Sequence, residues 1–136
     1  MPRWLTGIVD TLFGRTRANG PLGLRGENLA ARYLRDQGYK IILRNFRCNL
    51  GEIDIIARDG DTLVFVEVKT RAQDDPTPEE QVNLAKQHQL TKAGRFYLGR
   101  YGTPQPPARF DVVAVIWPQN HRPQIRHTKS AFQATF

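Results

Sequence analysis

Hydrophobic positions along the chain change period several times, and each change predicts an element. Between Leu22 and Gln37 the apolar residues recur at helical spacing and Gly38 follows, which predicts a helix that ends there. A second helical pattern covers roughly residues 79 to 100. Alternating or continuous apolar runs predict strands over residues 39–48, 52–58, 62–70, 110–117 and 124–127.

The order of these elements predicts the fold class. A helix precedes three strands joined by short turns, and a second helix then leads to a fourth strand and a short fifth one. A helical crossover between the third and fourth strands makes those two parallel. The run FDVVAVIW, residues 110–117, is the most uniformly apolar of the strand candidates, which suggests a central strand covered on both faces. We therefore expect an α/β fold with a mixed sheet flanked by helices.

The hairpin over residues 51–71 carries acidic residues on its apolar face. If Asp59 and Gly60 form a two-residue turn, Asp54 lies opposite Phe65 and Glu52 lies opposite Glu67. Period-two alternation then places these side chains on one face together with Lys69, with Asp54 diagonal to Glu67 at roughly 7–8 Å.

Like charges on a partly apolar face are costly unless a cation joins them. Oxygen ligands without His or Cys nearby favour Mg²⁺ or Mn²⁺ over zinc. Lys69 could hold an attacking water or stabilise charge on a phosphate, so the set fits phosphodiester hydrolysis. An ordinary hairpin with solvated charges is the alternative, because Glu-x-Lys recurs in salt-bridged surface strands.

Three other charged residues each allow two interpretations. Glu27 falls on the apolar stripe of the first helix, so its carboxylate is expected to point toward the sheet. The alternative is that this acid, near the start of the helix, only stabilises the helix through its dipole. Glu52 either supports the metal site or pairs with a basic residue such as Arg44 or Arg47. Lys86 lies on the apolar stripe of the second helix and either snorkels to the surface or reaches the site.

Composition and charge limit the class of protein. The chain has 136 residues, with 20 Lys and Arg against 13 Asp and Glu, giving a net charge of +7. This length suits one domain, over residues 21–136, preceded by a flexible or amphipathic leader over residues 1–20. The basic balance favours a polyanion such as nucleic acid, although a merely soluble basic protein is the alternative. A single Cys48 and the lack of an apolar run of about 20 residues predict a cytoplasmic protein without a membrane span.

The pattern of acids and elements resembles the PD-(D/E)xK nuclease superfamily, whose core is restriction-endonuclease-like with the order αβββαβ. Asp54 matches the first motif acid, although Ile53 rather than proline precedes it. Glu67, Val68 and Lys69 match the second motif. Glu27 matches the acid on the first helix of Holliday junction resolvases of this fold.

A closer resemblance covers roughly residues 22 to 133. The stretch GENLAARYLRDQGYKIILRNFRCNLGEIDIIARDGDTLVFVEVKTR, with the later KQHQLTKAGRFYL and RFDVVAV, is similar to the bacterial YraN-like family, whose members are described as endonuclease-like.

The resemblance implies roles for individual residues. Asp54, Glu67 and the Val68 carbonyl would bind Mg²⁺ or Mn²⁺, Lys69 would be the catalytic lysine, and Glu27 would be a further ligand or a water-positioning acid. By analogy with the superfamily, the expected nucleic acid is DNA rather than RNA, and contacts to it are expected from Arg25, Arg44, Arg47, Arg71 and Lys86.

The resulting expectation is a Mg²⁺-dependent DNA endonuclease, selective for branched or junction DNA, and a homodimer if it acts on two strands. The alternative is a nucleic-acid-binding or scaffold protein that keeps the nuclease fold without turnover. A third interpretation is an adaptor that acts through its amphipathic N-terminus.

Overall fold

The computed structural model describes the backbone of residues 15–134 and the side chains of residues 21–134. Most of the predicted leader, residues 1–14, therefore lies outside the described part. The elements in chain order are helix α2 (Arg15–Asp36), strands β1 (Lys40–Cys48), β2 (Gly51–Asp59) and β3 (Thr62–Arg71), the 3₁₀ turn η1 (Pro78–Gln81), helix α3 (Leu84–Leu98), the 3₁₀ turn η2 (Gly99–Tyr101), and strands β4 (Ala108–Ile116) and β5 (Gln124–Phe132).

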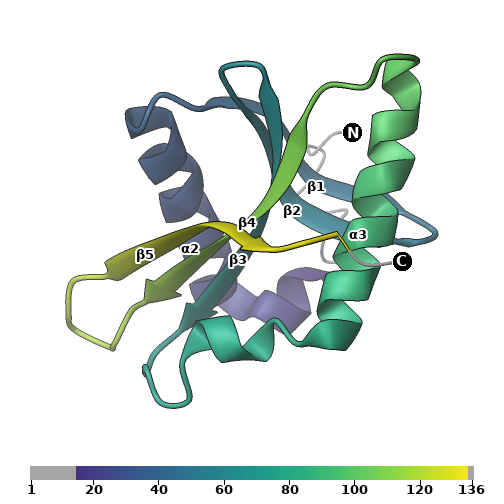
Figure 1. The fold of residues 1–136 in the computed structure, drawn as a ribbon. Helices are drawn as coiled ribbons and strands as arrows, with labels where there is room; N and C mark the ends of the chain where they lie inside the picture. Colours follow the sequence, from purple (N-terminus) through teal and green to yellow (C-terminus); the bar gives the residue numbers. More distant parts are fainter. Residues whose placement is uncertain (1–14, 135–136) are drawn as a thin grey trace.

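The strands form one mixed sheet in the order β1-β2-β3-β4-β5. Strands β3 and β4 are parallel, as the helical crossover predicts, and the other neighbours are antiparallel. Helix α2 and helix α3 cover opposite faces of this sheet (Figure 1). The fold is thus α/β with a restriction-endonuclease-like αβββαβ core, extended by β5, and this confirms the predicted class.

Two apolar clusters hold the three layers together. On one face, Ala30, Ala31 and Leu34 of α2 pack against the sheet residues Ile55, Ala57, Val64, Val66, Val113 and Val115. On the other face, Leu90, Ala93 and Tyr97 of α3 pack against Phe65 and its neighbours. Strand β4 contributes to both clusters and is buried from Phe110 to Ile116, as expected for a central strand.

Several element boundaries differ from the prediction. Helix α2 begins at Arg15 and contains Pro21, so it extends into the segment predicted as leader. The second helical stretch is divided in two, because Asn83 caps α3 by accepting a hydrogen bond from the Lys86 amide at 2.9 Å. Strand β5 continues to Phe132, well beyond the short strand predicted. No helix between residues 15 and 134 is long and apolar enough to cross a bilayer.

The register of the β2–β3 hairpin also differs from the prediction. Asp59 pairs with Thr62, so the turn residues are Gly60 and Asp61 rather than Asp59 and Gly60. Gly60 takes a φ of 60° at the first turn position, where type II′ turns place glycine. Ile56, not Asp54, therefore lies opposite Phe65, and the predicted Glu52–Glu67 pair is wrong. Extending the register by one position places Asp54 opposite Glu67.

Candidate functional site

A polar cavity of about 320 Å³ lies between the two helices and the sheet. Helix α2 contributes Glu27, and helix α3 contributes Lys86. Strands β2 and β3 supply the rest of the predicted constellation, and the lining includes Glu52, Asp54, Glu67, Val68, Lys69 and Arg71. Residues separated by up to about 60 positions in the chain thus meet at one site.

Asp54 and Glu67 form a buried pair of carboxylates. Asp54 is 7% exposed and Glu67 is 4% exposed, and their side chains share a hydrogen bond. The Val68 amide donates a hydrogen bond of 2.8 Å to Asp54 Oδ2, which ties the β2 acid to β3. Burial first, and then repulsion from Asp54, raises the pKa of Glu67 to about 8 despite the opposing effect of two lysines.

Two lysines approach the same oxygen of Glu67. Lys69 Nζ lies 3.7 Å and Lys86 Nζ lies 3.6 Å from Glu67 Oε2. Lys86 therefore reaches into the cavity from α3 rather than snorkelling away from it. Both ammonium groups are partly exposed, so they could contact an anion that enters the cavity.

Glu27 enters the cavity because α2 runs very close to β3. A Cβ atom on Gly26 would lie 1.9 Å from Thr70 Oγ1, so only glycine permits this approach. The next residue, Glu27, is 4% exposed, and Arg44 Nη2 lies 3.5 Å from its Oε1. The inward orientation predicted from the helical stripe is confirmed.

The predicted phosphate-binding arginines separate into different environments. Arg44 pairs with Glu27, and Arg47 Nε lies 3.8 Å from Glu52 Oε1, which matches the pairing considered for Glu52. Arg71 lines the cavity, where its Nε donates to Gln81 Oε1 at 2.9 Å. Arg25 lies outside the cavity with its guanidinium 4.1 Å from the Trp117 ring centroid.

The donor set suits a hard divalent cation held in part by water or substrate. Among the described residues, no three His, Cys, Asp or Glu side chains form a cluster that could bind a metal. Mg²⁺ commonly uses only one or two carboxylates and fills its other positions with waters and phosphate oxygens. The Asp54–Glu67 pair, buried beside an open polar cavity, meets that requirement, and no His or Cys lines the cavity.

Gln89 and Thr70 also line the cavity, and sequence reasoning did not identify them. Gln89 Oε1 accepts a hydrogen bond of 3.5 Å from Lys86 Nζ. Gln89 lies three residues after Lys86 on α3, so the (i, i+3) spacing from a candidate site residue was an available signal.

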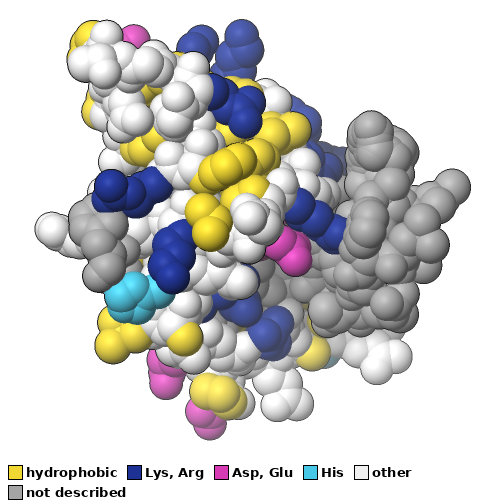
Figure 2. Space-filling view, turned by 90° about the vertical axis from the view of Figure 1, so that its right-hand side faces the viewer, with side chains coloured by type: hydrophobic (Ala, Val, Ile, Leu, Met, Phe, Trp, Pro, Cys, Tyr) yellow, Lys and Arg dark blue, Asp and Glu magenta, His cyan; other side chains and the backbone are white. Residues whose placement is uncertain are grey.

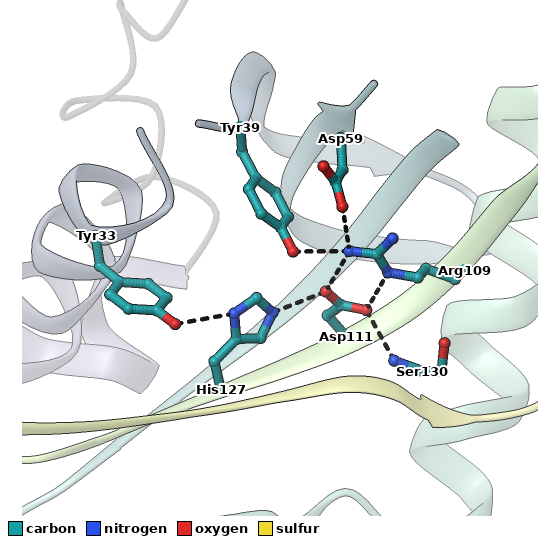
Figure 3. Close-up of polar contacts among 7 residues, drawn as sticks. All are labelled: Tyr33, Tyr39, Asp59, Arg109, Asp111, His127 and Ser130. Atoms are coloured by element: carbon teal, nitrogen blue, oxygen red, sulfur yellow. Dashed lines mark hydrogen bonds and ion pairs between the residues drawn. The ribbon is translucent and has the colours of Figure 1, made fainter. Parts of the chain in front are cut away.

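A second buried polar cluster occupies the face covered by α2 (Figure 3). Asp111 accepts hydrogen bonds from His127 Nε2 at 2.8 Å, Arg109 Nε at 3.0 Å and the Ser130 amide at 3.0 Å. With its proton on Nε2, His127 can accept at Nδ1 from the Tyr33 hydroxyl, 3.1 Å away. The buried Asp111 carboxylate is thus satisfied by groups of the described chain, which fits a structural role for the cluster. In the sequence, the signal that could have identified this cluster was Asp111, an acid inside the otherwise apolar strand β4.

Basic side chains are also found on the surface of the molecule outside the cavity. The face in Figure 2 shows Lys and Arg side chains spread widely, with few Asp or Glu side chains between them. Exposed residues on α3 include Lys92 and Arg95. This distribution agrees with the net charge of +7 and provides a surface suited to an extended polyanion.

Comparisons with known proteins place the chain in one family. The family model described as "Uncharacterised protein family UPF0102" matches residues 26–115. A UPF0102 protein of Geobacter sulfurreducens is 49% identical over 119 residues, covering 87% of this chain and 93% of that protein. Others from Geotalea uraniireducens and Nocardia farcinica are 46% and 44% identical, and the alignments cover 94% and 97% of their lengths. The chain belongs to the UPF0102 family.

Proposed function

We propose that this protein is a Mg²⁺- or Mn²⁺-dependent DNA endonuclease of the PD-(D/E)xK type. The observation that carries the proposal is the buried Asp54–Glu67 pair with two lysines within 4 Å of Glu67. Burying two carboxylates against each other costs stability, and a divalent cation would remove that cost. A purely structural ion pair would need one acid and one base, whereas this site gathers several of each.

The residues can be assigned complementary tasks. Asp54, Glu67 and the Val68 carbonyl would hold the cation, which supplies Lewis-acid activation of the phosphate and of water. Lys69 would orient the attacking water and favour loss of its proton, and Lys86 would stabilise charge on the phosphate oxygens. Glu27, held by Arg44 on the cavity wall, is placed better to position water than to complete a ligand cluster.

A cleavage assay tests this proposal. Linear, flapped and four-way-junction DNA are incubated with the protein in Mg²⁺, Mn²⁺ or EDTA, and products are resolved on denaturing gels. The wild type should cleave only with metal, with a preference for branched DNA. D54N should lower the rate by at least about 100-fold, because it removes a metal ligand. D61N makes the same substitution at an exposed turn residue of the same hairpin and should leave the rate unchanged.

The alternative function, nucleic-acid binding without turnover, gives a different pattern. It predicts metal-independent binding to the same DNA and no products under any condition. Cleavage that persists in D54N would point to a contaminating nuclease and contradict the assignment of the site.

A further inference from the structure

A second groove, about 740 Å³ in volume, lies outside the carboxylate cavity. One wall is formed by the part of α2 around Arg25, and the other by residues 117–122, which follow β4. The two hollows are lined by consecutive residues at two places in the chain. Gly23 and Arg71 line the carboxylate cavity, while their neighbours Leu22 and Ala72 line the groove. A DNA strand bound at the carboxylates could therefore continue into this groove.

The described lining of the groove lacks the acidic residues of the carboxylate cavity. Its described lining residues include Arg25, His121 and Arg122 but no Asp or Glu. The Arg25 guanidinium lies 4.1 Å from the centroid of the Trp117 ring, a separation typical of cation–π contact. Cationic side chains without acidic neighbours favour phosphate groups.

The Arg25–Trp117 pair adds a preference for unpaired nucleotides. Arginine planes and aromatic rings stack with the faces of bases that are not already stacked in a helix. The backbone at Trp117 is tied to β3, because its amide donates a hydrogen bond of 2.8 Å to the Arg71 carbonyl at the end of that strand. The stacked pair is therefore anchored to the strand that carries Glu67 and Lys69.

We propose that this groove binds a single-stranded DNA arm next to the phosphate held at the carboxylate site. Arg25 and Trp117 support an unpaired base, and Arg122 contacts the backbone phosphate. This inference rests on the proposed function, because it extends the path of the same DNA. It gives a physical reason for selecting branched substrates, in which single strands leave a duplex.

Binding in EDTA tests the groove separately from cleavage. Fluorescence anisotropy would compare a labelled duplex with the same duplex carrying a single-stranded oligothymidine arm. The wild type should bind the armed DNA about 10-fold more tightly, a gain expected from stacking and phosphate contact. The double variant R25Q/R122Q should lose this preference. R35Q removes one charge from an exposed position near the end of α2 and should keep the preference for the armed DNA.

A second measurement does not depend on charge. The chain has two tryptophans, so W4F leaves Trp117 as the sole indole, and its fluorescence should be quenched by the arm. Equal affinity of the wild type for both DNAs, an unchanged preference in R25Q/R122Q, or no quenching would overturn the proposal. Arm preference without cleavage in any metal would refute the hydrolytic function and leave the groove assignment standing. Cleavage without arm preference would refute the groove assignment and leave the hydrolytic function standing.

Discussion

At the scale of single residues, the main feature is Glu67, a carboxyl group buried beside another carboxyl. Its side chain contacts Asp54, Lys69 and Lys86 at once. Its pKa rises to about 8, so near neutral pH the metal-free protein holds a proton that the unfolded chain would release. Stability, and the proposed binding of a metal, should therefore depend on pH through this residue.

The pH dependence of unfolding tests that coupling. Because the folded pKa is above the ordinary value of 4.5, the folded state binds more protons between pH 4.5 and about 8. The free energy of unfolding of the metal-free wild type should therefore fall across this range, by up to about 5 kcal/mol. E67Q removes the titrating carboxyl at position 67 and should show a flatter profile in urea denaturation with EDTA. D61N, at an exposed acid, should follow the wild type, and an identical slope in E67Q would contradict this account.

The Asp111 cluster makes a prediction of the opposite sign. Burial alone raises the pKa of Asp111, but hydrogen bonds from His127, Arg109 and Ser130 outweigh it, so the pKa lies below its ordinary value. Its contribution to stability is therefore present above pH 3.8 and is lost as the pH falls below that value.

Substitution of Asp111 should be costly because this fully buried carboxylate accepts hydrogen bonds from His127, Arg109 and the Ser130 amide. D111N should lower the free energy of unfolding at pH 7 by about 3–5 kcal/mol, measured by urea denaturation. D74N makes the same change in an exposed ion pair with Arg126 and should cost about 1 kcal/mol or less. Equal effects of the two variants would contradict the structural role of the Asp111 cluster.

At the scale of elements, the site depends on the close approach of α2 to β3. Gly26 contacts Thr70, and this contact sets the depth at which Glu27 enters the cavity. Gly51, the first residue of β2, makes a similar contact, because a Cβ on it would lie 2.6 Å from Gln89 Cγ on α3. Both helices are thus positioned against the sheet by glycines next to acidic site residues.

G26A tests this arrangement. The added methyl would overlap the Thr70 side chain and force α2 away from β3, at a cost of about 1–3 kcal/mol or more. Thermal unfolding should show a lower Tm, and metal-dependent cleavage should fall as Glu27 moves. G99A is the matched control, since a Cβ there meets no atom within 4 Å and its φ of −56° suits alanine. A Tm for G26A equal to that of G99A would contradict the proposed role of the contact.

At the scale of the whole molecule, the sequence predicted the layers and the composition of the site but not the hairpin register. The segment Asp59-Gly60-Asp61 allows two different two-residue turns, Asp59-Gly60 and Gly60-Asp61. The structure has the second, with Gly60 at the first turn position and a positive φ. The two registers differ by an even number of positions, so each side chain keeps its face and the acids still meet. For that reason Asp54, Glu67 and Lys69 could be grouped correctly from a wrong alignment.

Other features could not be predicted because they depend on contacts between distant elements. The Asp111–His127 bond and the approach of Lys86 to Glu67 join residues from different parts of the fold. The extra turns of α2 before Leu22 pass through Pro21, a residue that normally marks a helix start. The periodicity of the sequence indicates which face of a helix or strand a residue lies on. It does not indicate which residues of distant elements come into contact in the folded structure.

The central claim is that Asp54 and Glu67 bind a divalent cation, and calorimetric titration with Mn²⁺ tests it most directly. The purified wild type should bind Mn²⁺ at one site, with affinity increasing as the pH rises toward 8 because the metal displaces the Glu67 proton. D54N should lose at least about 10-fold in affinity and D61N should bind like the wild type. Equal Mn²⁺ affinity of D54N and the wild type would contradict the claim.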